Sequence, residues 1–129
     1  MRNPEIPLLA EKLRALGHFV YDDWHAPGPE ADEYWRQYEL ARGHKYQEAL
    51  AGWHAHHVFE NDKFHLDLCD TGVLLMPAGR SAHLELGYLA RGGKETYVVF
   101  PQEPDRFDIM YRFCTGVFTS VEDLVAALA

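Results

Sequence analysis

The chain has 129 residues, of which 47% are hydrophobic and 25% are charged, and its formal net charge is −8. This balance is typical of a soluble globular protein, and the length predicts one domain over residues 1–129. The acidic charge argues against a duplex nucleic acid partner, because such binders need a basic surface. No apolar run approaches the roughly 20 residues of a membrane span, and residues 1–5 show no signal-peptide pattern. We therefore expect a cytoplasmic protein with no membrane partner.

The order of the predicted elements favours an α/β fold. Helices are expected over residues 5–16, 30–42, 44–52, 58–69, 81–91, 105–112 and after Ser120. Strands are expected over residues 18–22, 72–77, 96–100 and 116–119. The second and third of these strands are continuous apolar runs, which is typical of strands covered on both faces in a parallel sheet. Helices that alternate with such strands predict a mostly parallel sheet, whose ligands bind beyond the carboxyl ends of the strands.

Cysteines and histidines give weaker signals. Cys69 and Cys114 lie far apart without a CxxC pattern, and both are expected to be buried free thiols. Four histidines lie between residues 54 and 65, and three of them form a His-x-His-His pattern. This pattern is compatible with a metal site, but no cysteine or facing carboxylate accompanies it, so we favour histidines at a helix edge. The prediction is that the protein uses no metal and no other cofactor.

The most informative stretch covers residues 70–88. It predicts a strand, a turn of small residues and a helix start, with Ser81 as the N-cap. Free backbone N–H groups at this helix start, beside Arg80, would form a cradle for an anion. Glu85 would lie near the end of the first helical turn, where the helix dipole favours its ionised form. An ionised carboxylate in a pocket is able to act as a nucleophile or to stabilise an oxocarbenium ion, although the spacing alone favours a first-turn acid with no such role.

The nine residues of this stretch that read Gly-Arg-Ser-Ala-His-Leu-Glu-Leu-Gly, residues 79–87, resemble a known family. The block is similar to that of the nucleoside 2-deoxyribosyltransferase-like superfamily, above all its small bacterial and phage members, and the likeness extends over most of the chain. The resemblance implies that Glu85 attacks the anomeric carbon of a deoxyribosyl group. It also implies that Asp62 assists at the leaving base or holds the sugar. Arg80 and Ser81 would suit a 5′-hydroxyl or a 5′-phosphate, although Arg80 would pair equally well with an acidic side chain.

Further candidate ligand contacts are less specific. Trp24 is able to stack on a nucleobase, although core packing is the default explanation for it. His83 would contact the substrate, contact a neighbouring subunit or have a structural role. Asp22 lies where a predicted strand ends near the ligand, and Asp70 is a second carboxylate near the site or a structural residue at a strand start. Gly79, also counted as substrate-binding, stands where deoxyribosyltransferases proper carry an aspartate six residues before the glutamate, which favours a phosphate-bearing substrate.

The resemblance also bears on the fold and on assembly. It implies a flavodoxin-like or Rossmann-like three-layer sandwich. Relatives begin with a buried central strand ahead of the residues that match Arg2 and Asn3, and no such strand precedes them here. Either the chain continues upstream or the fold lacks its usual first strand, in which case another chain would have to cover the gap. Because relatives form homo-oligomers, a dimer or a larger homo-oligomer is expected.

The function that follows is cleavage of the N-glycosidic bond of a 2′-deoxynucleoside or its 5′-monophosphate, by hydrolysis or base exchange. Glu85 and Asp62 are the catalytic candidates, and the partner is a small nucleoside or nucleotide. One alternative is a non-catalytic nucleotide-binding or sensor module. Another is a hydrolase of a different ribosyl nucleotide, such as an NAD derivative, which rests on fold analogy alone.

Overall fold

The described chain divides into two compact units. The structure is a computed structural model and describes residues 3–22 and 29–129. The first unit, which we call the sheet unit, contains Asn3–Asp22 and Leu66–Ala129. The second, the helical unit, contains residues 29–65. None of the described helices is long and apolar enough to cross a membrane.

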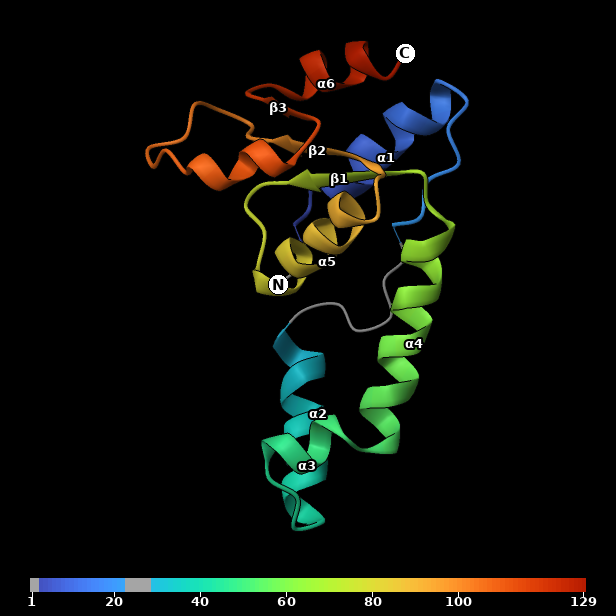
Figure 1. Cartoon of the computed structure of the whole chain (residues 1–129), viewed down its shortest axis with the longest axis vertical. Helices are drawn as coiled ribbons and strands as arrows, with labels where there is room; N and C mark the ends of the chain where they lie inside the picture. Colours follow the sequence, from blue (N-terminus) through green and yellow to red (C-terminus); the bar gives the residue numbers. More distant parts are fainter. Residues whose placement is uncertain (1–2, 23–28) are drawn as a thin grey trace. The chain divides into compact units, whose positions relative to one another are not determined.

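The sheet unit contains three parallel strands in the order β1-β2-β3 (Figure 1). They are β1 (Thr71–Leu75), β2 (Glu95–Val99) and β3 (Gly116–Phe118). In register, Leu75 of β1 lies opposite Val99 of β2, which lies opposite Phe118 of β3. Helices lie between the strands in sequence, so the predicted α/β class with a parallel sheet is confirmed, and the arrangement is that of a flavodoxin-like or Rossmann-like sandwich.

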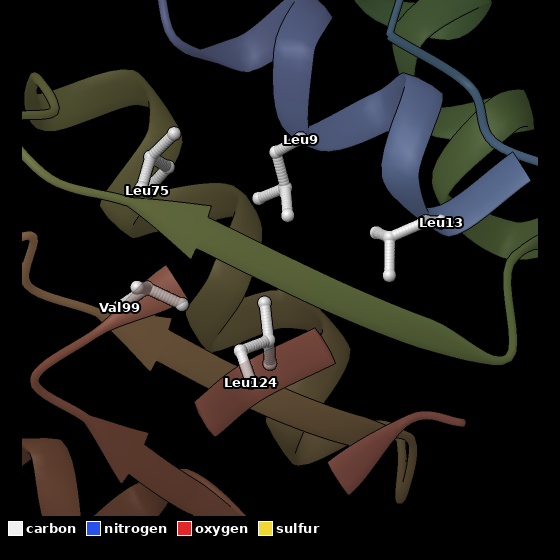
Figure 2. Packing of buried hydrophobic residues seen from close by; sticks show 5 residues of the cluster. All are labelled: Leu9, Leu13, Leu75, Val99 and Leu124. Carbon is white, nitrogen blue, oxygen red and sulfur yellow. The ribbon is translucent and has the colours of Figure 1, made fainter. Parts of the chain in front are cut away.

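Helices cover both faces of this sheet. α1 (Ile6–Ala15) and α6 (Val121–Ala127) lie on one face, and α5 (Arg80–Arg91) lies on the other (Figure 1). On the first face, five buried side chains from four elements converge (Figure 2): Leu9, Leu13, Leu75, Val99 and Leu124. We call this set the α1–α6 cluster. Because side chains alternate along a strand, the neighbouring Leu74 and Val98 point to the opposite face, where they pack with Leu86 of α5.

The helical unit contains α2 (Pro29–Ala41), α3 (Tyr46–Leu50) and the first part of α4 (Trp53–Leu68). The division between the units falls within α4, between His65 and Leu66. The predicted helices are confirmed here, but α4 begins five residues before the expected start at residue 58. The His-x-His-His pattern therefore lies on a helix. At the other end of α4, Lys94 Nζ donates to the carbonyl oxygens of Leu66 and Asp67, at 2.9 and 2.7 Å.

Two predicted elements differ from the structure. Residues 18–22 form no strand, since their contacts are made by side chains and not by a backbone ladder. The Arg14 guanidinium donates to the Val20 carbonyl, and His18 Nε2 lies 2.7 Å from the Leu128 carbonyl oxygen. Phe19, which made the segment look apolar, is 97% exposed.

The helix expected over residues 105–112 is a short 3-10 helix, η1 (Ile109–Phe113). The carboxylate of Asp108 accepts a hydrogen bond from the Met110 backbone N–H and starts the turn there. Side chains of this kind compete with a continuous α-helix for backbone groups, which explains the late start.

Candidate active site

The candidate site is built on the turn that connects β1 to α5. β1 ends at Leu75, and α5 begins at Arg80 with Gly79 as its N-cap. The prediction that Ser81 is the N-cap is therefore wrong, since Ser81 already lies within the first turn. Gly79 provides no side-chain cap, and the first N–H groups of a helix have no intrahelical acceptor. These groups remain open to an anion at the carboxyl end of β1.

Asn3, in the N-terminal segment, forms hydrogen bonds to this turn. Its side-chain amide donates to the carbonyl oxygens of Leu75 and Pro77, at 3.4 and 3.5 Å. The other side-chain atom, Oδ1, accepts from the Glu5 backbone N–H at 3.0 Å, just before α1. One side chain therefore ties the start of α1 to the end of β1.

His83 holds the first turn of α5 from the side of η1. Its Nδ1 lies 2.8 Å from the Gly79 carbonyl oxygen, and its Nε2 lies 2.9 Å from the Tyr111 hydroxyl. A carbonyl oxygen only accepts, so the neutral imidazole donates through Nδ1 and accepts from Tyr111 through Nε2. Burial raises the pKa of Tyr111, and nearby Asp108 raises it further, so this hydroxyl stays protonated as a donor.

Glu85 lies on the opposite flank of α5 from His83. Residues two positions apart in an α-helix are rotated by about 200° around its axis. The side chains of His83 and Glu85 therefore point about 160° apart. Ser81 and Tyr88 share the flank of Glu85, because they lie four residues before it and three residues after it. Glu85 is half buried, and the Tyr88 hydroxyl donates to the Asp67 carboxylate. The block of residues 79–87 therefore presents a serine and a carboxylate on one flank and a histidine on the other.

Arg80 and Ser81 are exposed in the first turn of α5. Within the described ranges 3–22 and 29–129, no acidic side chain forms an ion pair with Arg80. An anionic ligand would meet there the cationic guanidinium of Arg80 and the N–H donors at the positive end of the helix dipole.

The other predicted site residues lie elsewhere in the chain. Asp22 accepts from the Arg14 guanidinium at 2.8 Å, so its carboxylate already has a cationic partner. Asp70 is exposed at the amino end of β1, the opposite end of the strand from the turn before α5. Asp62 belongs to the helical unit. Trp24 lies outside the described residues.

The structure also describes the two cysteines and the four histidines between residues 54 and 65. Cys69 and Cys114 are free, as predicted, but they are half buried. Burial raises the pKa of both thiols, and Lys94 partly offsets this at Cys69. Among the side chains that the structure describes, no group of three or more His, Cys, Asp or Glu is arranged to hold a metal ion.

Two contributors to the site were not predicted as such from the sequence. No sequence motif identifies Tyr111. Only the fold brings it next to His83, which is 28 residues away in the sequence. Asn3 was singled out only as part of the family likeness, and its contacts with Leu75 and Pro77 span more than 70 residues. An Asn-Pro pair ahead of a helix does signal a cap, but it does not indicate a strand end as the second partner.

Comparison of the chain with protein-family models, with curated proteins and with solved structures finds no match. The case for a function therefore depends on the block of residues 79–87 and on the surroundings that the fold gives it.

Proposed function

We propose that the protein cleaves the N-glycosidic bond of a 2′-deoxynucleoside or its 5′-monophosphate, by hydrolysis or by base exchange. The observation that carries this proposal is the local fold of residues 79–87. A half-buried carboxylate, Glu85, lies on a helix whose open N-terminus follows the carboxyl end of a parallel strand. In open α/β sheets this is the usual location of a ligand.

In the proposed reaction, the Glu85 carboxylate attacks the anomeric carbon while the bond from this carbon to the base breaks. The transition state resembles an oxocarbenium ion, and a glycosyl ester forms on Glu85. The leaving base takes up a proton as this bond breaks. Water, or a second base, then attacks the same carbon and releases Glu85, so the configuration at this carbon is retained overall.

Arg80 and the first N–H groups of α5 are proposed to bind a 5′-phosphate. Ser81, on the flank of Glu85, is proposed to contact the sugar or its 5′-oxygen. The His83–Tyr111 hydrogen bond supports this assignment indirectly, because it holds the Gly79 carbonyl and with it the first turn of α5. Gly79 contributes through its backbone, where no side chain obstructs a ligand.

The test is chromatographic. The protein is incubated with deoxynucleosides and deoxynucleoside monophosphates, with and without a second base, and free base or exchanged product is measured. Glu85→Gln is expected to abolish product formation, whereas Glu122→Gln in the first turn of α6 leaves it unchanged. Nucleotide binding without product, unaffected by Glu85→Gln, would instead support a non-catalytic binding module. Cleavage confined to ribosyl substrates would support the NAD-type alternative.

The phosphate assignment has its own test. Arg80→Ala is expected to raise KM for monophosphates about tenfold or more, because a hydrogen bond to a charged group contributes about 1.5–3 kcal/mol. Nucleosides without a phosphate should show no such change. Arg91→Ala, an exposed arginine in the last turn of the same helix, is the matched control. Equal effects of Arg80→Ala on nucleosides and monophosphates would contradict phosphate binding at this turn.

A further inference from the structure

The ring of His83 holds the start of α5 more closely than the backbone does. The carbonyl of Gly79, the N-cap of α5, accepts from the His83 backbone N–H at 3.3 Å. The same carbonyl oxygen lies 2.8 Å from the ring nitrogen Nδ1 of His83. The hydrogen bonds from Asn3 to this turn are long as well, at 3.4 and 3.5 Å. Because the usual N–H···O distance is about 2.9 Å, the ring forms the best of these contacts.

Tyr111 connects this ring to the end of β2. The Tyr111 ring packs edge-on against Phe100, the residue after β2, with ring centroids 5.6 Å apart. Four residues further on, the Thr115 backbone N–H donates to the Thr96 carbonyl of β2 at 2.7 Å. From this anchored position the Tyr111 hydroxyl lies 2.9 Å from Nε2 of His83. The hydrogen bond therefore connects the first turn of α5 with the carboxyl end of the neighbouring strand.

The two partners of His83 together select one tautomer of its ring. The Gly79 carbonyl binds the ring only when Nδ1 carries the proton, because two acceptors in contact repel each other. Nε2 of this tautomer is an acceptor, and the Tyr111 hydroxyl supplies the donor that it needs. Burial raises the pKa of Tyr111, so the hydroxyl keeps its proton. Tyr111 therefore favours the ring form that binds the N-cap of α5.

The turn held in this way carries Arg80 and Ser81, the proposed contacts with the phosphate and the sugar. Both residues are exposed, and no side chain caps the first N–H groups of α5. The position of these groups relative to the sheet depends on how the turn is held at Gly79. The side chain of His83 points away from the flank of Glu85, so the contact is suited to placing the ligand and not to acting on the reacting carbon.

From these contacts we infer that Tyr111 is a positioning residue for the proposed reaction. It acts through His83 on the first turn of α5, and through this turn on the binding of the 5′-phosphate. In this role Tyr111 does not need to contact the substrate. The inference rests on the proposed function. Loss of the Tyr111 hydroxyl should weaken the binding of a monophosphate and leave the chemical step unchanged.

The first test is steady-state kinetics of Tyr111→Phe, which keeps the ring and removes only the hydroxyl. The variant is expected to raise KM for deoxynucleoside monophosphates about three- to tenfold, as the loss of one neutral hydrogen bond does, with kcat unchanged. KM for nucleosides should not change. Tyr97→Phe is the matched control, because it removes a hydroxyl that donates to Glu95 beside the α1–α6 cluster. An unchanged KM, or an equal loss of activity on both kinds of substrate, overturns the inference.

A double-mutant cycle tests whether Tyr111 acts through His83. His83→Asn places an amide where Nδ1 lies and has no atom at the position of Nε2, so it loses the contact with Tyr111. Tyr111→Phe should then add no further increase in KM for monophosphates in the His83→Asn background. Additive effects of the two substitutions would show that Tyr111 acts independently and overturn the inference.

Nitrogen-15 NMR of the histidine rings provides a measurement that does not depend on activity. His83 is expected to carry its proton on Nδ1 in the parent, and the fraction protonated on Nε2 should rise in Tyr111→Phe but not in Tyr97→Phe. A proton on Nε2 in the parent, or no response to Tyr111→Phe, overturns the inference even if the protein cleaves nucleotides. The expected spectra from a parent that releases no base would refute the proposed function, and the role of Tyr111 in substrate binding with it, but not the contact itself.

Discussion

Gly72 lies where β1 passes closest to α5. A Cβ atom at this position would come within 2.5 Å of Cδ1 of Leu89, a side chain that is 5% exposed. Gly72→Ala is therefore expected to lower the free energy of unfolding by about 1–3 kcal/mol, the usual cost of overpacking a core. Urea denaturation followed by circular dichroism measures this loss.

Gly87→Ala is the control for this substitution. Gly87 lies in the interior of α5, with no atom within 4 Å of the added Cβ. Alanine is a better helix former than glycine, so the free energy of unfolding of this variant should rise by about 0.5–1 kcal/mol. Destabilisation by both variants would show that contact with Leu89 is not the cause at Gly72.

The two thiols give a prediction about pH. Burial raises the pKa of Cys69 and Cys114 above the ordinary value of 9.0. As the pH rises past 9, the unfolded chain releases thiol protons that the folded chain still holds. The free energy of unfolding should therefore fall as the pH rises through this range. For the same reason, iodoacetamide should alkylate both thiols more slowly in the native protein at pH 8 than in urea. Equal rates in the two conditions would contradict the burial of the thiols.

At the scale of single elements, the starts of α5 and α6 differ in how they are capped. The Ser120 hydroxyl accepts from the Asp123 backbone N–H at 3.1 Å and caps α6. Ser81 lies inside the first turn of α5 and caps nothing. A side chain therefore caps the first turn of α6, whereas the N-cap of α5, at the candidate site, provides no side-chain acceptor.

Ser120→Ala should consequently destabilise the protein by about 1 kcal/mol, the typical effect of losing an N-cap. Ser81→Ala should change the free energy of unfolding by less than about 0.5 kcal/mol, as surface substitutions usually do. Thermal or urea denaturation compares the two variants. A larger loss for Ser81→Ala than for Ser120→Ala would refute the assignment of Gly79 as the N-cap.

At the scale of the whole molecule, one leucine of the last helix connects most of the sheet unit. Leu124 is completely buried and packs in the α1–α6 cluster with residues from α1, β1 and β2 (Figure 2). The first and last helices of the described chain thus share one core with the two longer strands. Loss of this packing should affect the whole sheet unit at once.

Leu124→Ala is expected to lower the free energy of unfolding by about 2–5 kcal/mol. This is a large part of the roughly 5–15 kcal/mol that stabilises a typical protein. Leu84→Ala, at a position that is 76% exposed on α5, should stay within about 0.5 kcal/mol of the parent. Urea unfolding monitored by near-UV and far-UV circular dichroism provides the comparison. Similar losses for the two leucines would contradict the core assignment.

Local sequence patterns determined much of this protein. The apolar runs at residues 72–77 and 96–100 predicted β1 and β2, because strands covered on both faces need continuous apolar side chains. Helical spacing identified α1 and α5, and Ser120 marked the start of α6. The class of fold followed from the order of these elements alone.

Tertiary contacts decided the rest. The sequence of residues 18–22 resembles a strand, but this segment is held by side-chain contacts. Arg14 donates to the Val20 carbonyl, and His18 contacts the Leu128 carbonyl. The N-cap of α5 is Gly79 and not Ser81, and the carbonyl of Gly79 is held by a histidine that Tyr111 contacts from another element. His18 and Leu128 are 110 residues apart, and His83 and Tyr111 are 28 residues apart, so no local pattern specifies these contacts. Side-chain hydrogen bonds over these separations form only once the sheet has brought both ends together.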